Sequence, residues 1–230
     1  MKKIFVLSTT LLLICIISRA QKSSAILRGG VNLANVTVTD NGSIDDTKML
    51  TSFQLGLIGD LHVAPFLAIQ PGILLSGKGT KSESGDPSDA NYFKATTNPL
   101  YIEIPVNVVL KGPIGKEAKI FAGAGPYLGI GIAGKNKVEG KFLGTAFSSE
   151  EKIEWSNDDP STLNYEEGAG FGIMKRFDYG LNGTAGIEGK NVVLSVNYGL
   201  GLAKLQSGSD SGSDENNKHR VLSFTLGFKL

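Results

Sequence analysis

The sequence of 230 residues lacks features that define several common classes of protein. Its single cysteine, Cys15, lies within the first 20 residues, so the rest of the chain has neither disulfides nor thiolate chemistry. The 23 basic and 22 acidic residues include no basic cluster, which argues against binding to nucleic acid. With only 8 prolines, the chain is not collagen-like or proline-rich. After residue 20, no apolar run reaches the roughly 18 residues of a membrane-spanning helix.

The first 20 residues have the pattern of a secretory signal. Two lysines precede the apolar segment 4–17, and a small-x-small cleavage site ends at Ala20. We therefore expect residues 1–20 to be a cleaved signal peptide and residues 21–230 to form the exported domain. Cys15 could be read as a lipid-anchored cysteine, but the residue before it is too large for that processing site.

Glycine and strict alternation dominate the remaining sequence. Glycine occurs 30 times, about twice its usual share of roughly 7%. From residue 25 onward, apolar residues tend to fall on every second position, as in β-strands, where successive side chains point to opposite faces. The closing segment 220–230 shows this most clearly, because one face is small or polar and the other is bulky and apolar. The apolar face consists of Leu222, Phe224, Leu226, Phe228 and Leu230.

The alternation predicts eight strands joined by alternating long and short connections. We expect strands at about 25–34, 53–63, 67–76, 100–111, 119–133, 177–188, 192–202 and 220–230. The long polar connections are 37–51, 78–99, 134–176 and 206–219, and residues 138–153 can extend the neighbouring strands as a hairpin. In an up-and-down meander, all long loops emerge at one end, as in outer-membrane barrels. The predicted fold is all-β, an eight-stranded antiparallel up-and-down transmembrane β-barrel.

The strands of a soluble ligand-binding barrel also alternate between apolar and polar residues, but their apolar face points inward. The composition of the polar face must therefore distinguish a soluble barrel from a membrane barrel. From Phe121 onward, the strands at 119–133 and 192–202 present Gly, Ser, Asn and Tyr on that face, without charge. Small residues suit the crowded lumen that eight strands enclose, so we favour the membrane barrel. Candidates for aromatic girdles at the membrane interfaces are Phe53, Phe66, Tyr127, Tyr179, Tyr198, Phe224 and Phe228.

The same parity directs ionisable side chains into the lumen, where an unpaired charge costs several kcal/mol. These residues are Arg28, Asp60, His62, Glu103, Asp178, Glu188 and Lys229. We expect Arg28 and Lys229, on the neighbouring first and last strands, to join the carboxylates of Glu103, Asp178 or Glu188. Such a network would be a plug that closes the lumen. In the alternative arrangement, the charges lie unpaired at the watery rims.

Motifs for catalysis or cofactor binding are weak in this sequence. Gly129-x-Gly131-x-x-Gly134 matches a dinucleotide fingerprint, but no helix is expected after it to meet the phosphate. His62 and His219, the only imidazoles, are predicted at opposite ends of the barrel and cannot share a catalytic site. The acidic loops lack the spacing of a calcium loop. We therefore predict a non-enzymatic protein with no catalytic residues, cofactor or metal.

Several short pieces, in their order along the chain, resemble a known family. They are Gly30-Val31-Asn32-Leu33, Gln70-Pro71, Tyr101-Ile102-Glu103-Ile104-Pro105, Ala122-Gly123-Ala124-Gly125-Pro126-Tyr127, Phe177-Asp178-Tyr179-Gly180-Leu181 and Asn197-Tyr198-Gly199-Leu200. Over about residues 25–230, the chain resembles the PorT-like outer-membrane β-barrel proteins of Bacteroidetes-type bacteria. The closing strand looks like the signal read by the barrel-insertion machinery, although it ends on Leu230 rather than an aromatic residue. The resemblance implies an outer-membrane barrel and no particular role.

We expect an integral protein of the bacterial outer membrane with a side-chain-filled lumen and long extracellular loops for surface interaction. The expected partners are outer-membrane lipid and the barrel-assembly machinery, and no nucleic acid. An alternative role is that of an accessory subunit in an envelope secretion or transport system, which requires an envelope protein partner. A lipid-modifying barrel enzyme is a third hypothesis.

Overall fold

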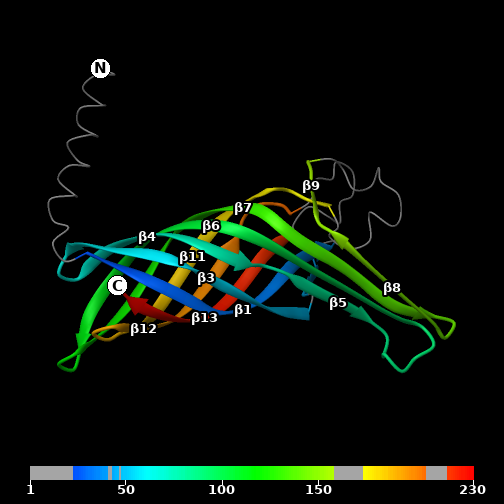
Figure 1. Cartoon of the computed structure of the whole chain (residues 1–230), viewed down its shortest axis with the longest axis horizontal. Coiled ribbons are helices and arrows are strands. Elements are labelled where there is room, and N and C mark those ends of the chain that lie inside the picture. The colour runs from blue at the N-terminus through cyan, green and yellow to red at the C-terminus, as the bar shows by residue number, and fades with distance from the viewer. Residues whose placement is uncertain (1–22, 41–42, 47, 158–172, 206–216) are drawn as a thin grey trace, which may run out of the picture.

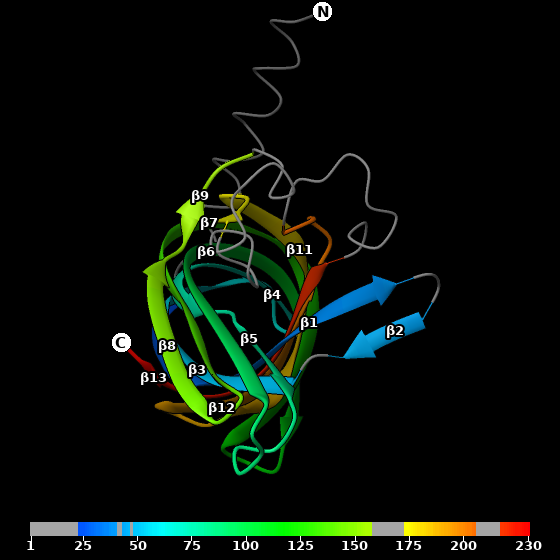
Figure 2. The same ribbon diagram turned by 90° about the vertical axis from the view of Figure 1, so that its right-hand side faces the viewer.

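In the computed structural model, which describes residues 23–40, 43–46, 48–157, 173–205 and 217–230, eight antiparallel strands form a closed ring (Figures 1 and 2). The ring strands are β1 (Ser24–Asp40), β3 (Lys48–Ala64), β4 (Leu67–Gly77), β6 (Tyr92–Ile114), β7 (Ala118–Phe142), β11 (Phe177–Glu188), β12 (Val192–Gly201) and β13 (Lys218–Lys229). The ring closes because β1 pairs with β3 on one side and with β13 on the other. The predicted eight-stranded antiparallel barrel is therefore confirmed. The predicted signal peptide lies outside the described residues.

Further short strands extend the barrel at one end. They are β2 (Ser43–Asp46), β5 (Thr80–Ser84), β8 (Thr145–Lys152), β9 (Glu154–Trp155) and β10 (Ile173–Met174). Strand β5 pairs with β6, β6 with the far part of β7, and β7 with β8. These four segments form a sheet, here called the outer sheet, that continues beyond the ring (Figure 1). We call this end of the barrel the loop end and the opposite end the turn end.

The structure corrects the prediction that residues 37–51 and 78–99 are loops. Strand β1 continues to Asp40 and β3 begins at Lys48, while β5 and the start of β6 occupy much of 78–99. These extensions are polar, so they lack the apolar alternation that marks the ring strands. Cross-strand pairing of β6 with β7 continues beyond the ring instead, with a register shift between Leu100 and Tyr101. The predicted hairpin extension at 138–153 is confirmed by β7 and β8. Residues 158–172 and 206–216 of the predicted loops lie outside the described chain.

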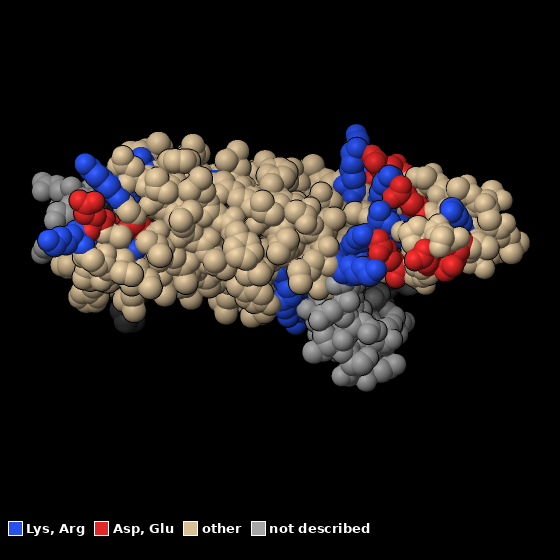
Figure 3. Space-filling model, turned by 90° about the horizontal axis from the view of Figure 1, so that it is seen from below, with Lys and Arg blue, Asp and Glu red and all other residues tan. Residues whose placement is uncertain are grey.

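The outward face of the ring is apolar, and the inward face is largely polar but also carries a buried apolar cluster of Ile26, Ile58, Leu74, Val109, Phe121 and Val193. Phe224, Leu194 and Ile120 are half exposed on the outside, whereas Asn32, Gln54 and other polar side chains are buried inside. Figure 3 shows a broad surface band that is largely free of Lys, Arg, Asp and Glu between two charged ends. A soluble barrel would have these faces reversed. The band is therefore the surface that contacts lipid.

Six of the seven predicted girdle aromatics point outward and are 46–60% exposed. They are Phe53, Phe66, Tyr179, Tyr198, Phe224 and Phe228. The prediction is wrong for Tyr127, which is 4% exposed and donates a hydrogen bond to Asp178 inside the barrel. Tyr127 lies an even number of residues from buried Phe121 on β7, so the alternation of the strand places both side chains on the inward face. Among the described residues, no helix is long and apolar enough to cross a membrane.

Candidate functional site

Polar side chains fill the lumen in successive levels, which can be followed along the inward face of β6. From the turn end this strand contributes Lys111, Asn107, Glu103 and Tyr101, all of them buried. Every second residue of a strand lies on the same face, so a single long strand contributes side chains at each level along the lumen. Two charged clusters are separated by the buried apolar cluster that includes Val109 and by a layer rich in amides and hydroxyls, and an apolar lid lies over the loop end.

The turn-end cluster consists of Lys111, Asp60, Glu188 and Lys229. The Lys111 Nζ atom lies 2.6 Å from Asp60 Oδ2 and 2.5 Å from Glu188 Oε2. Both Lys111 and Asp60 have fully buried side chains. Lys229 forms an ion pair with the other oxygen of Glu188, and Gln70 donates a 3.0 Å hydrogen bond to Asp60. Two cations thus face two anions, and the cluster is electrically balanced.

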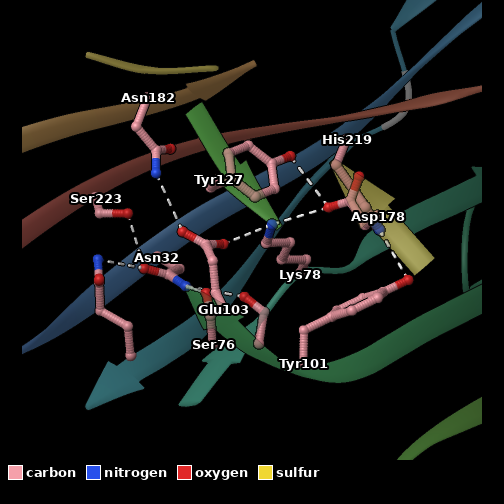
Figure 4. Close-up of polar contacts among 12 residues, drawn as sticks. Asn32, Ser76, Lys78, Tyr101, Glu103, Tyr127, Asp178, Asn182, His219 and Ser223 are labelled. Atoms are coloured by element: carbon pink, nitrogen blue, oxygen red, sulfur yellow. Dashed lines mark hydrogen bonds and ion pairs between the residues drawn. The ribbon is translucent and has the colours of Figure 1, made fainter. Parts of the chain in front are cut away.

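The loop-end cluster consists of Lys78, Glu103, Asp178 and Tyr127 (Figure 4). The Lys78 Nζ atom lies 2.6 Å from Glu103 Oε2 and 2.9 Å from Asp178 Oδ2. It also lies 4.0 Å from the centroid of the Tyr127 ring, a distance suited to a cation–π contact. Because two carboxylates share one ammonium group, the cluster by itself has an excess of one negative charge.

Arg28 and a set of amide and hydroxyl side chains occupy the level between the clusters. The guanidinium donates hydrogen bonds of 3.4 Å each to Asn197 Oδ1 and Gln54 Oε1, and no carboxylate among the described residues forms an ion pair with it. Nearby, Asn32 donates to Ser76 at 3.1 Å and accepts a 2.8 Å bond from Ser223. Arg28 offsets the negative excess of the loop-end cluster. The lumen therefore holds four cations and four anions.

The cavity at the level of Arg28 is small. The internal cavity beside Arg28, Glu103 and Asn182 has a volume of about 30 Å³. A single water requires roughly 10–15 Å³ on the same measure, so the cavity holds about two water molecules. A continuous aqueous path would need far more space. The side chains at this level therefore leave room for little more than ordered water.

An apolar lid lies over the loop end of the lumen. It consists of Val36, Ile153, Met174 and Leu205, with Trp155 packed against them. The Trp155 indole makes an edge contact with the Tyr101 ring at 5.6 Å, and Tyr101 makes a similar contact with His219 at 5.5 Å. A Cβ atom at Gly131 would lie 2.3 Å from the indole, so only glycine leaves room for this side chain.

The structure brings together some residues of the predicted charge network and separates others. Lys229 and Glu188 form an ion pair, whereas Glu103 and Asp178 meet only through Lys78. Arg28 lies near Glu103 along the same cavity but donates its hydrogen bonds to amides. The five residues thus belong to two clusters and to the layer between them.

Sequence reasoning missed the two lysines at the centres of the clusters. Lys111 lies on the inward face of a predicted strand, so the alternation that identified Glu103 was also a signal for Lys111. Lys78 follows β4 immediately, in a segment that we predicted to be a loop, and no sequence pattern indicates that it turns inward. Its position depends on the tertiary structure.

The closing strand has the predicted orientation. Phe224, Leu226, Phe228 and Leu230 are 42–74% exposed on the outside, and Leu222 is partly buried beside its β1 partner Leu33. The role of this strand in membrane insertion stays a prediction.

The two histidines occupy different ends of the barrel, as expected. His219 is buried beside Tyr101 near the lid, whereas His62 Nδ1 lies 3.7 Å from Asp60 Oδ2 in the turn-end region. No nucleophile with an adjacent base is evident among these contacts. Within the described part of the chain, no three residues of His, Cys, Asp or Glu group together in a way that could hold a metal ion.

Exposed ion pairs lie along the outer sheet and its junction with β3. Glu83 accepts a 2.6 Å hydrogen bond from Lys48 on β3 and lies 2.5 Å from Lys81. These two lysines lower the pKa of the Glu83 carboxyl to about 2. A second set joins Glu139 to Lys137 at 2.6 Å. Exposed pairs of this kind contribute little to stability, so backbone pairing is what holds the outer sheet.

The closed ring with an apolar exterior defines an integral membrane β-barrel. The chain belongs to the outer membrane protein beta-barrel domain family, which matches residues 19–207. Membership of this family places the protein in the bacterial outer membrane. This match does not test the resemblance to the PorT-like group, which stays a prediction.

Several solved structures are similar to this chain. Ail of Yersinia pestis, solved in complex with the heparin analogue sucrose octasulfate, has 12% identity and a TM-score of 0.41, covering 91% of this chain and 100% of Ail. Neisserial surface protein A has 12% identity and a TM-score of 0.42, covering 91% and 99%. OprG of Pseudomonas aeruginosa has 14% identity and a TM-score of 0.37, covering 90% and 96%. At these identities, the likeness concerns the fold alone. A comparison with curated proteins gave no match.

Proposed function

We propose that this protein is a non-enzymatic, closed outer-membrane barrel whose outer sheet serves for interaction at the cell surface. The observation that carries the proposal is the filled lumen. Two charged clusters, the layer around Arg28 and the apolar lid occupy the lumen, and the cavity beside Arg28 has a volume of only about 30 Å³. A barrel of this kind is a rigid support, and its recognition surfaces lie outside the ring. Export through cleavage of residues 1–20 is part of this proposal.

The outer sheet supports a role in protein interaction. All eight residues of β8 are exposed, and among the described residues this strand pairs only with β7. Its other edge presents backbone N–H and C=O groups that an extended segment of a partner can pair with. The short turns at the opposite end offer no comparable edge, since Ala64 and Leu67 are separated by only two residues.

The accessory-subunit role is a second candidate, favoured by the same edge of β8. An extended segment of an envelope protein would pair with it as readily as a segment of an external protein. Co-purification of a defined envelope protein that is lost when residues 143–153 are removed would support this role. Barrel assembly, monitored by heat-dependent gel mobility, is the control for that deletion.

Surface presentation can be tested by cysteine labelling in intact cells. In a Cys15→Ser background, Ser148→Cys on β8 is expected to react with a membrane-impermeant maleimide, because long loops of outer-membrane barrels face outward. Lys116→Cys, in the turn between β6 and β7, is the matched control and is expected to react only after the outer membrane is permeabilised. Labelling of Lys116→Cys but not Ser148→Cys in intact cells would contradict the proposal.

A further inference from the structure

One face of the outer sheet carries a group of phenylalanines. Register pairs Phe93 of β6 with Gly140 of β7, and Gly140 with Phe147 of β8, so these residues lie on one rung and on one face. The Phe147 ring lies against Gly140, because a Cβ atom added there would be 2.5 Å from Cζ of the ring. Alternation extends this face, here called the aromatic face, through Ala95, Val138 and Phe142.

The opposite face of the outer sheet carries charged side chains. Alternation along the four strands places on it Lys81, Glu83, Lys94, Lys135, Lys137, Glu139 and Glu150. Each of them forms an ion pair with another member of this set. Figure 3 shows charged side chains gathered over the outer sheet, beyond the uncharged band. The outer sheet is therefore amphipathic, and its charged face is satisfied internally.

The aromatic face lies on the inner side of the sheet and ends at an open edge. Along β6 the row of Phe93 leads to buried Tyr101, so this face continues the inward side of the ring and not the side that contacts lipid. Phe93, Phe142 and Phe147 are nevertheless 37–67% exposed. Within the described residues, β8 pairs only with β7, so the face stops at an unpaired strand edge beside Phe147. A strand added there would extend both the backbone ladder and the aromatic face.

The side chains along this edge define what a partner strand must contain. The last three residues of β8 on the aromatic face are Phe147, Ser149 and Glu151. No described residue forms an ion pair with Glu151, whereas Glu150 on the charged face is paired with Lys135. An added antiparallel strand places one residue opposite each side chain of this row. The matching residues are an apolar one opposite Phe147, a small polar one opposite Ser149 and a cation opposite Glu151.

We propose that the edge of β8 binds an extended protein segment with a basic, a small polar and an apolar residue at alternate positions, in that order from its N-terminus. This inference rests on the proposed role of the outer sheet in protein interaction. Main-chain hydrogen bonds to β8 supply affinity for any extended segment, and the three alternate side chains supply specificity. A second copy of this chain matches less well. Two-fold pairing of β8 centred on Ser149 places Glu151 opposite Phe147 of the other copy, where it meets no cation.

Titration of the purified barrel in detergent micelles, followed by nuclear magnetic resonance, tests the proposal. The probe is a peptide with lysine, serine and phenylalanine at alternate positions, in that order, separated and flanked by threonine. We expect saturable shifts of the amide signals of residues 145–152. Glutamate in place of the peptide lysine is expected to weaken binding about fivefold, because opposite charges across a strand pair attract and like charges repel. Methylation of every backbone amide nitrogen of the peptide is expected to abolish binding, since the main-chain hydrogen bonds are then lost.

A charge exchange on β8 tests the pairing with Glu151. Glu151→Lys is expected to reverse the preference, so that the glutamate peptide binds about fivefold more tightly than the lysine peptide. Glu150→Lys, on the charged face of the same strand, is the matched control and is expected to keep the preference for the lysine peptide. Phe147→Ala is expected to weaken binding of both peptides about fivefold. Heat-dependent gel mobility verifies that every variant is folded.

Three results would overturn the proposal. They are equal affinity of the unaltered protein for the two peptides, an unreversed preference in Glu151→Lys, and the same shifts of residues 145–152 on raising the protein concentration without peptide. The last result would assign the edge to a second copy of the chain. The titration uses purified protein and does not depend on orientation in the membrane. Labelling of Ser148→Cys in intact cells without peptide binding would therefore leave the surface role standing and refute only the present proposal.

Discussion

Replacing Lys111 with methionine is expected to lower the free energy of unfolding by about 3–5 kcal/mol. Lys111 is fully buried and forms ion pairs with both Asp60 and Glu188. Methionine fills much of the same volume but leaves Asp60 with only the hydrogen bond from Gln70 and the more distant His62. Removing one member of a buried ion pair is costly because the remaining charge stays desolvated. The change in free energy is measured by urea titration, with the folded fraction at each urea concentration read from heat-dependent gel mobility.

The cost at Lys111 should disappear when the buried carboxylates are neutralised. The triple variant Lys111→Met, Asp60→Asn, Glu188→Gln is expected to recover most of the lost stability, since no buried anion then lacks a partner. Lys116→Met, in the exposed turn, is the control and is expected to change stability by less than about 0.5 kcal/mol. A loss in Lys111→Met no larger than in Lys116→Met would show that the turn-end cluster does not stabilise the barrel.

Replacing Gly125 with alanine is expected to destabilise the barrel by about 3 kcal/mol or to block its assembly. An added Cβ atom would lie 1.9 Å from the backbone oxygen of Val106 and 2.7 Å from the Cα atom of Asn107. Both contacts are with backbone, so β6 and β7 must move apart where they pair. The heat-modifiable fraction of protein in outer membranes measures assembly.

Gly183→Ala is the matched control for the change at Gly125. It adds the same methyl group to the neighbouring strand β11, but on the outward face, where nothing lies within 4 Å. We expect normal assembly of this variant. Equal assembly of Gly125→Ala and Gly183→Ala would contradict the account of a close backbone approach between β6 and β7 at Gly125.

The ring strands were predictable from the sequence because apolar and small residues alternate along them. Val108, Leu110 and their equivalents face lipid, and this requirement imposes a strict period of two on every ring strand. The same parity identifies Asp178 and Glu188 as inward-facing. The alternation along a strand shows which charged side chains point inward, but it does not show which of them form contacts. Those contacts depend on the stagger between strands that are distant in sequence.

The outer sheet was less predictable because its side chains are largely solvated. Strand β8 is exposed on both faces. Because neither face is buried, residues 145–152 need not alternate between apolar and polar side chains. Lys78 illustrates a second limit. It lies one residue beyond β4, 100 positions from Asp178 in sequence, and only the closure of the ring brings the two together. A local pattern does not contain that information.

Ion conductance across a planar lipid bilayer tests most directly the claim that side chains close this barrel. With purified protein inserted, and a general porin as the positive control for insertion and detection, we predict no steady conductance above the bare membrane. The cavity beside Arg28, between the two charged clusters, has a volume of only about 30 Å³, which is too little for a hydrated ion path. Stable, reproducible conductance steps from the unaltered protein would contradict the account.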